Sequence, residues 1–285
     1  MFHNPPTKAR RVALLAAVAV ATLAVASRGR ADLWIQSYAA SRNDRFYSGA
    51  DKAFIGQPYD WSGVGQQGGV YWATMISPEY FISANHYHPA LGGTLTFYED
   101  NTYNHPRTYT VDSSWSANDG DLFLGRLTAP IPAADHITYY PVLDLPNDAD
   151  YVGREILVNG KPNRVGLNVI TYAGTYMTYS YDTYGSPGSL GDEEAYIIAG
   201  DSGGPSFTDV NGIMAVLGTH YWNYGSPPVN GSVSGDSFVP DCIAWLDSQM
   251  VGEQVTVVTP EPGTLTLLAA AAACAVAVLV RRACV

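Results

Sequence analysis

Residues 200–205 read Gly-Asp-Ser-Gly-Gly-Pro and contain the residue types that nucleophilic chemistry needs. A serine hydroxyl is a weak nucleophile unless a base removes its proton and N–H groups stabilise the oxyanion that forms. Flanking glycines allow a tight turn in which the N–H groups of Gly200 and Ser202 point at one spot that no side chain blocks. The hexapeptide therefore predicts that Ser202 is a nucleophile with a backbone oxyanion hole. The alternative is an ordinary glycine-rich turn.

A nucleophilic serine needs a base, and His86 is the best placed of the six histidines. It lies in Ile-Ser-Ala-Asn-His-Tyr at 82–87, directly after a predicted strand, where a loop can hold the imidazole and leave one face open. His88 follows two residues later; His-x-His could also suggest a metal pair, but no third ligand stands at a recognisable spacing. His105 and His136 lack such a context and are expected at the surface.

A carboxylate that orients the histidine is expected at Asp121, in Gly-Asp-Leu-Phe-Leu-Gly-Arg-Leu at 120–127. A polar residue that opens a buried strand can point inward and accept the Nδ1–H of the histidine, which fixes the tautomer and stabilises the imidazolium. Asp119 is the competing candidate. The apolar run begins immediately after Asp121, and this favours Asp121.

These three segments, in the order His86, Asp121, Ser202, resemble those of trypsin-like serine peptidases, which have the chymotrypsin fold. Segment 82–87 is similar to the family's Thr-Ala-Ala-His-Cys, and segment 120–127 to its Asn-Asp-Ile-Ala-Leu-Leu-Lys-Leu. The resemblance covers about residues 53–250. It implies a serine endopeptidase that acts on protein or peptide substrates without a metal or cofactor. It also implies an all-β domain of two six-stranded antiparallel β-barrels with a C-terminal helix.

The same resemblance places the substrate pocket beside Tyr196 and the residues Thr219, His220 and Tyr221. Glutamate-specific bacterial relatives carry a histidine on this strand that binds the carboxylate of the P1 residue, the one before the scissile bond. His220 matches that pattern; the alternative is a histidine satisfied at a barrel edge. Tyr196 stands about where trypsin has an aspartate, so specificity for Lys or Arg is not supported. The acidic residues 192–194 either line the cleft or form a solvated loop.

Asp201, the residue before the nucleophile, pairs in the family with a new N-terminus that zymogen cleavage creates. The nearest match to that N-terminus is a poor one, Phe-Ile-Gly at 54–56, with Lys52 as the cleavage point. An internal cation or backbone donors are the alternative partners for Asp201. Residues 32–52 are accordingly interpreted as an N-terminal lead or propeptide.

Composition is typical of an exported β-rich domain. Residues 32–259 contain 8 Lys and Arg against 25 Asp and Glu, a formal net charge of −17, which excludes nucleic acid and an anionic membrane face as partners. They contain one cysteine, Cys242, and so can form no internal disulfide. Pro240 and an apolar face predict one helix over 240–250. Short apolar runs between turn residues predict strands at 70–76, 80–83, 94–98, 122–127, 155–158, 168–172, 206–208 and 213–217.

Both ends of the chain resemble targeting signals. Residues 1–31 combine basic residues with an apolar core, which is typical of a secretory signal peptide. Residues 260–285 contain Pro-Glu-Pro, an uncharged run of 17 residues and two arginines, and residues 251–259 read as a spacer before them. This order resembles the PEP-CTERM sorting signal of Gram-negative bacteria, which implies an exosortase-type processing enzyme and a transient C-terminal transmembrane helix. The alternatives are plain membrane anchors.

The terminal signals predict that the domain lies outside the cytoplasm, at the cell surface, outer envelope or extracellular matrix. A rival hypothesis assumes the same fold without catalysis. The protein would then be a non-catalytic trypsin-fold module that binds extracellular polysaccharide or a surface protein. Exposed Tyr and Trp side chains in 172–184 and 221–224 would then stack on sugars. A complete set of His86, Asp121 and Ser202 argues for the enzyme, since a binding module has no use for all three.

Overall fold

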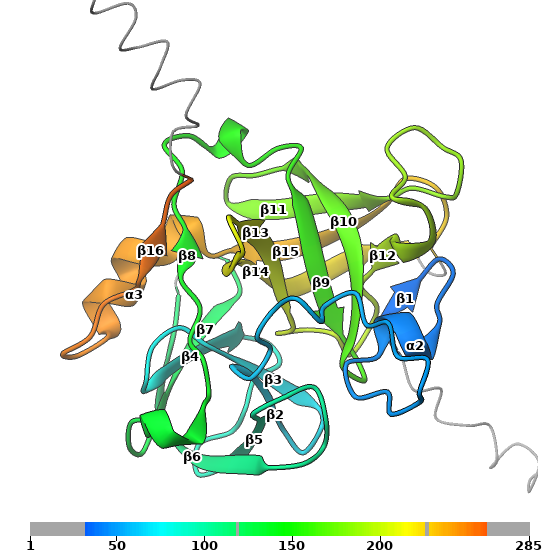
Figure 1. Cartoon of the computed structure of the whole chain (residues 1–285). Coiled ribbons are helices and arrows are strands. Elements are labelled where there is room, and N and C mark those ends of the chain that lie inside the picture. The colour runs from blue at the N-terminus through cyan, green and yellow to red at the C-terminus, as the bar shows by residue number, and fades with distance from the viewer. Residues whose placement is uncertain (1–31, 118–119, 226–227, 261–285) are drawn as a thin grey trace, which may run out of the picture.

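The computed structural model describes residues 32–117, 120–225 and 228–260, and most of their strands form two closed barrels (Figure 1). All strand pairs within the first barrel are antiparallel. In spatial order, it consists of β2 (Val64–Gln67), β3 (Tyr71–Met75), β4 (Tyr80–Ala84), β7 (Leu122–Leu127), β6 (Pro106–Ser116) and β5 (Thr94–Tyr98).

The second barrel closes because its strand β13 pairs with β14 on one side and with β9 on the other. Its six strands, in spatial order, are β13 (Pro205–Val210), β9 (Glu155–Gly160), β10 (Arg164–Tyr172), β11 (Tyr176–Tyr181), β15 (Ser232–Phe238) and β14 (Ile213–Tyr224). Two six-stranded antiparallel barrels are the arrangement of chymotrypsin-like folds, so the expected fold class is confirmed at this level.

Four short strands lie beside the second barrel. β8 (Val142–Leu143) pairs in parallel with β14, and β16 (Val257–Val258) pairs in parallel with β8. At another place β1 (Trp34–Ile35) pairs with β12 (Ala195–Tyr196). The segment 251–259, interpreted as a spacer, therefore contributes a strand to this domain.

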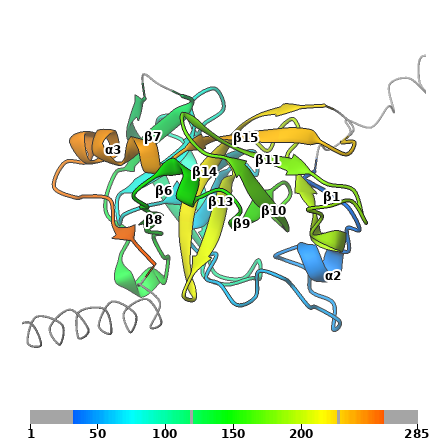
Figure 2. The same ribbon diagram turned by 90° about the horizontal axis from the view of Figure 1, so that it is seen from above.

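The expected C-terminal helix is present as a 3₁₀ turn, Pro240–Cys242, followed by α3 (Ile243–Gln249). A second short helix that the sequence did not predict, α2 (Ala40–Asn43), lies with β1 at the opposite end of the molecule from α3 (Figure 2). Three further 3₁₀ turns are Ala133–Asp135, Asp148–Asp150 and Gly191–Glu193. Among the described residues no helix is long and apolar enough to cross a membrane. The segments interpreted as signal peptide and transmembrane helix, 1–31 and 261–285, lie outside them.

Alternation along the strands divides the core into three clusters. Phe81 and Ile82 are neighbours on β4 and both fully buried, but Phe81 points into the first barrel and Ile82 into a cluster that both barrels share. Successive strand residues face opposite sides, so a strand at the barrel junction is apolar on both faces. The shared cluster includes Leu124 of β7, Phe207 of β13 and Leu246 of α3. It fixes the two barrels against each other and thereby fixes the ends of β4, β7 and β13.

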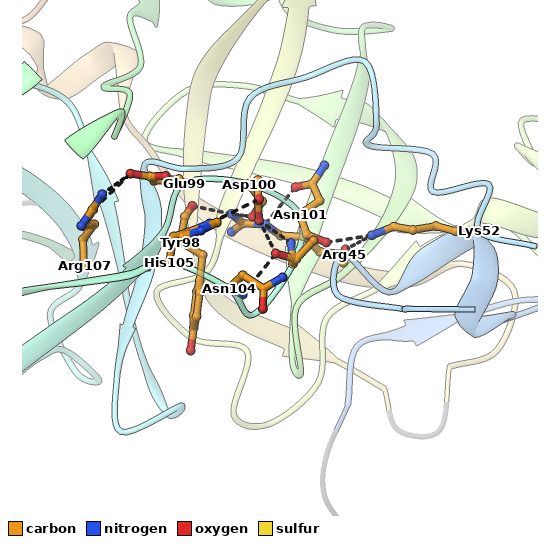
Figure 3. Close-up of polar contacts among 10 residues, drawn as sticks. Arg45, Lys52, Tyr98, Glu99, Asp100, Asn101, Asn104, His105 and Arg107 are labelled. Atoms are coloured by element: carbon orange, nitrogen blue, oxygen red, sulfur yellow. Dashed lines mark hydrogen bonds and ion pairs between the residues drawn. The ribbon is translucent and has the colours of Figure 1, made fainter. Parts of the chain in front are cut away.

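Residues 32–52, interpreted as a lead or propeptide, form part of this core. Arg45 is 1% exposed, and its guanidinium donates to the carbonyl oxygens of Val64 (3.3 Å), Tyr98 (3.0 Å) and Asp100 (3.0 Å). Lys52 donates to the carbonyl oxygen of Arg45 itself at 2.7 Å (Figure 3). Burial lowers the pKa of Arg45 to about 10, so the group stays charged at neutral pH. The N-terminal segment thus clamps the loop between β5 and β6.

Replacing Arg45 by Met should destabilise the protein by about 3 kcal/mol, because buried carbonyl oxygens would lose a charged donor. Urea unfolding at neutral pH measures the change. Arg154→Met is the matched control: Arg154 is partly exposed, and its hydrogen bond to the carbonyl oxygen of Asp150, four residues away, is open to solvent. Its loss should change the free energy of unfolding by about 0.5 kcal/mol or less. Equal effects of the two substitutions would contradict the clamp.

Candidate active site

His86 and Asp121 are held together at the ends of two neighbouring strands of the first barrel. β4 and β7 pair antiparallel, so the residues just after β4 lie beside those just before β7. The N–H of Asn85 donates to the carbonyl oxygen of Asp121 at 2.6 Å, and the N–H of His86 donates to Asp121 Oδ1 at 2.9 Å. Asp121 is 5% exposed, and its own N–H donates to Ser237 Oγ at 3.2 Å, on the second barrel. The carboxylate therefore points inward, as a polar residue opening a buried strand was expected to do.

A continuous chain of hydrogen bonds joins Asp121, His86 and Ser202. His86 Nδ1 lies 2.5 Å from Asp121 Oδ2, and His86 Nε2 lies 2.9 Å from Ser202 Oγ. Since a carboxylate accepts at Nδ1, the proton of a neutral imidazole sits there and Nε2 accepts from the serine hydroxyl. Burial raises the pKa of Asp121, and the hydrogen bond from His86 opposes this shift. Asp119, the competing carboxylate, lies outside the described residues.

The turn around Ser202 depends on two glycines with left-handed backbones, Gly200 (φ 102°) and Gly203 (φ 80°). The N–H of Gly204 closes the turn by donating to the carbonyl oxygen of Asp201 at 2.9 Å. Within the described residues, the N–H groups of Gly200 and Ser202 have no backbone partner. These are the two donors that the sequence assigned to an oxyanion hole.

Backbone donors hold the carboxylate of Asp201. The side chain is fully buried; Oδ1 accepts from the N–H of Lys161 at 2.8 Å and Oδ2 from that of Ile198 at 2.9 Å. Burial raises the pKa of Asp201 to about 6, against the opposing effect of these hydrogen bonds. Of the partners weighed from the sequence, backbone N–H groups are therefore the ones in contact with Asp201.

A pocket of about 130 Å³ opens beside Ser202. Its walls come from the segment before the nucleophile turn and from the end of β14. Tyr221 is the one predicted substrate-binding residue that lines it, and the Tyr221 ring also lies 5.8 Å from the ring of His86. The pairing of β14 with β15 shifts between His220 and Trp222, and such a bulge turns Tyr221 toward the site. The residues lining the pocket are Ile197, Ile198, Ala199, Ser202, Tyr221, Trp222 and Asn223.

The other three predicted substrate-binding residues are buried around the pocket rather than exposed in it. Tyr196, Thr219 and His220 are each 0% exposed. The hydroxyl of Tyr196 donates to the carbonyl oxygen of Gly225. Both ring nitrogens of His220 are engaged inside the second barrel, with Asp236 and with the carbonyl oxygen of Asn159. In this structure His220 presents no nitrogen to a P1 side chain.

The acidic residues 192–194 do not line the pocket. Glu193 is buried and binds Arg42 and Asn43 of the N-terminal segment. Glu194 is 1% exposed, accepts the N–H of Leu190 at 2.7 Å, and has a pKa that burial raises to about 7. Glu193 and Glu194 therefore stabilise the fold. The sequence offered two alternatives for these residues, lining the cleft or forming a solvated loop, and neither describes Glu193 or Glu194.

Among the described residues, the other three histidines make no hydrogen bond with His86, Asp121 or Ser202. His105 and His136 are exposed, as expected. His88 stacks on Phe123 with ring centroids 4.0 Å apart. Within the described residues no group of three His, Cys, Asp or Glu side chains could hold a metal ion.

No family model matches the chain, and no curated protein matches it. The function of the protein is therefore inferred from its architecture and from the geometry around Ser202. Sequence reasoning missed the pocket walls formed by residues 197–199 and by Trp222 and Asn223. The apolar pair Ile197-Ile198, close to the hexapeptide, could have indicated this pocket wall. Nothing in the sequence indicates the bulge at Tyr221.

The space beside Gly203 should be essential to the turn. A Cβ at Gly203 would lie 2.5 Å from Ser83 Oγ and 3.1 Å from the backbone N of Ala84. We expect Gly203→Ala to cost more than about 2 kcal/mol in the free energy of unfolding and to break the contact between His86 and Ser202. Urea unfolding and a crystal structure of the variant measure these effects.

Gly212→Ala separates crowding from backbone strain. Gly212 has φ 85°, close to that of Gly203, but nothing lies within 4 Å of its Cβ position. The control should cost about 1 kcal/mol from the left-handed backbone alone. If both variants lose the same amount, the contact with Ser83 is irrelevant.

Proposed function

We propose that the protein is a serine endopeptidase that hydrolyses peptide bonds through Asp121, His86 and Ser202. The observation that carries the proposal is the hydrogen-bond chain from Asp121 Oδ2 through the imidazole of His86 to Ser202 Oγ, at the junction of two six-stranded barrels. The side chain of Asp121 is 7% exposed and that of His86 is 44% exposed. The orienting carboxylate is thus shielded while the base and the nucleophile are open to a substrate.

Each residue then has one role in the reaction. His86 Nε2 takes the proton of Ser202 as its Oγ attacks the substrate carbonyl, and the imidazolium is stabilised by Asp121. The N–H groups of Gly200 and Ser202 stabilise the negative oxygen of the tetrahedral intermediate. His86 next donates its proton to the leaving amine, and the acyl-enzyme forms. A water molecule, activated by the same imidazole, releases the acid and restores the serine.

The pocket beside Ser202 supports an uncharged P1 residue. None of its lining residues carries a charged side chain, and Glu193, Glu194 and His220 are engaged elsewhere. A volume of about 130 Å³ is smaller than the ~150 Å³ of an apolar protein cavity that accepts benzene. Aliphatic side chains such as Val and Leu fit these limits. Asp, Glu, Lys and Arg would lose hydration without gaining a partner.

We further propose that the enzyme is exported and sorted to the cell surface, outer envelope or extracellular matrix of a Gram-negative bacterium. The support is the sequence of residues 1–31 and 260–285, with an exosortase-type enzyme as the partner that processes the C-terminal segment. The acidic composition of residues 32–259 is compatible with this location.

The rival binding-module hypothesis rests on aromatic side chains at the surface. Tyr172, Tyr184 and Tyr224 are 53%, 74% and 77% exposed and could stack on sugars. Tyr179 and Tyr181, within the same stretch, are buried. The hypothesis gives no reason for the alignment of His86 with Ser202, and it predicts polysaccharide binding by a protein that hydrolyses nothing.

A fluorophosphonate probe should label the purified protein at Ser202, and Ser202→Ala should abolish labelling. Asp121→Asn should slow labelling by a factor on the order of 10⁴, because the histidine would be held in the wrong tautomer. Ser248→Ala, at an exposed serine of α3, is the control and should react like the parent. A parent protein that is folded and remains unlabelled would sink the proposal, and polysaccharide binding by that protein would favour the rival.

Trp222 should limit the size of the P1 side chain. Its indole crosses Gly235 on β15, where a Cβ would collide with it, and Trp222 is one of the residues that line the pocket. In a peptide library, the parent should prefer Val and Leu over charged P1 residues. Trp222→Ala should raise kcat/KM for Phe relative to Leu roughly tenfold, in line with ~1–3 kcal/mol per apolar group accommodated. Unchanged selectivity would show that P1 binds elsewhere.

A further inference from the structure

Three polar side chains and one backbone carbonyl meet inside the second barrel, beneath the turn that carries Ser202. His220 of β14, Asp236 of β15 and Tyr179 of β11 are each 0% exposed, and Asn159 of β9 contributes its carbonyl oxygen. His220 Nδ1 lies 2.9 Å from Asp236 Oδ1, and His220 Nε2 lies 3.0 Å from that carbonyl oxygen. The hydroxyl of Tyr179 donates to Asp236 Oδ1 at 3.2 Å. The reaction described above uses none of these side chains.

The partners of His220 define its protonation. A backbone carbonyl oxygen can only accept, so Nε2 carries a proton. The Tyr179 hydroxyl lies 3.2 Å from Asp236 Oδ1 and 3.4 Å from Nδ1, so it donates to the nearer oxygen. Asp236 Oδ1 then faces Nδ1 at 2.9 Å as an acceptor. Nδ1 therefore also carries a proton, and His220 is an imidazolium paired with the Asp236 carboxylate. Interaction with Asp236 and Asp201 raises the pKa of His220 in spite of its burial.

His220 is also bonded to the nucleophile turn through its backbone. Its carbonyl oxygen accepts from the N–H of Gly203 at 2.9 Å, and its N–H donates to the carbonyl oxygen of Gly204 at 2.8 Å. A Cβ at Gly204 would lie 2.8 Å from His220 Cδ2 and 2.9 Å from the carbonyl oxygen of Asp201. The imidazole thus packs directly against the turn.

β9 links His220 to Asp201 a second time. Asn159 accepts from His220 Nε2, and two residues later the N–H of Lys161 donates to Asp201 Oδ1. The groups that face this cluster are Asp236 from β15, Tyr179 from β11, Asp201 from the turn and Lys161 from the end of β9. The positive charge on His220 lowers the pKa of Asp201, and so does the charge on Lys161.

We propose that His220, as a buried imidazolium held by Asp236, is a positioning residue that keeps Asp201 ionised and so holds the turn presenting Gly200 and Ser202. The proposal rests on the proposed hydrolase function. An ionised Asp201 accepts two N–H donors at once, from Ile198 and Lys161. Protonation places an O–H beside one of those donors and breaks that contact. The turn then loses the geometry that aims the two oxyanion donors.

The sign of the pH dependence follows from this charge. Removing the positive charge of His220 raises the pKa of Asp201, so Asp201 becomes protonated at a higher pH. The active form is then lost earlier as the pH falls. We expect the acid limb of the kcat profile to move up by about one pH unit in His220→Gln and in Asp236→Asn, since either change removes the imidazolium.

The decisive measurement is NMR of the intact protein, which does not depend on activity. With ¹⁵N-labelled histidine, both nitrogens of His220 should remain protonated at about pH 8. With ¹³C-carboxyl aspartate, Asp201 should titrate about one unit higher in His220→Gln than in the parent. A neutral His220 in the parent, or an unshifted Asp201, overturns the proposal.

A control variant distinguishes positioning from a general loss of packing. Thr219→Val alters a buried neighbour without changing charge, so it should lower kcat without moving the acid limb. If His220→Gln behaves like Thr219→Val, the role of His220 is structural only and the proposal fails. If the fluorophosphonate labels none of these proteins, the hydrolase function fails, and the NMR result still decides the charge of His220.

Discussion

Burial of the Asp201 carboxylate is the constraint on which the rest of the site depends. A charge in the barrel interior is unfavourable unless donors surround it, and here the donors are the backbone N–H groups of Ile198 and Lys161. To reach both, the chain must double back on itself immediately before Ser202, and glycines with left-handed backbones make this possible. The position of Ser202 is therefore set by a buried side chain that lies beneath its turn.

The junction of the barrels sets the other half of the geometry. β4 and β7 are apolar on both faces because one face fills the first barrel and the other fills the shared cluster. Rigid strand ends there hold His86 and Asp121, while β13 and β14 hold the turn. Side chains from two barrels can then meet within 2.9 Å although each belongs to a separately closed sheet.

The sequence was sufficient for the local parts of this arrangement. The runs at 80–83 and 122–127 are largely apolar, and they are strands because both of their faces are mostly buried. The hexapeptide and the position of His86 after a strand followed from short-range pattern alone. By contrast, the strands β15 and β11 were not predicted. They read Ser-Val-Ser-Gly-Asp-Ser-Phe and Tyr-Met-Thr-Tyr-Ser-Tyr, and their small polar and tyrosine side chains give no clear alternation of apolar and polar residues. Partners such as His220 with Asp236 depend on which strands become neighbours, and no local pattern reveals that.

The few basic residues connect distant segments of a domain that has a single cysteine. Residues 32–259 contain eight Lys and Arg, and several join segments far apart in sequence: Arg42 binds Glu193, Arg164 binds Asp32 and Asp44, and Arg126 binds Glu79. Exposed pairs of this kind contribute little singly, but Arg45 and Glu193 are buried and satisfied by several partners. The N-terminal segment is thereby attached to both barrels. The domain can therefore carry an excess of acidic residues, because its few arginines form ion pairs and hydrogen bonds between segments that are distant in sequence.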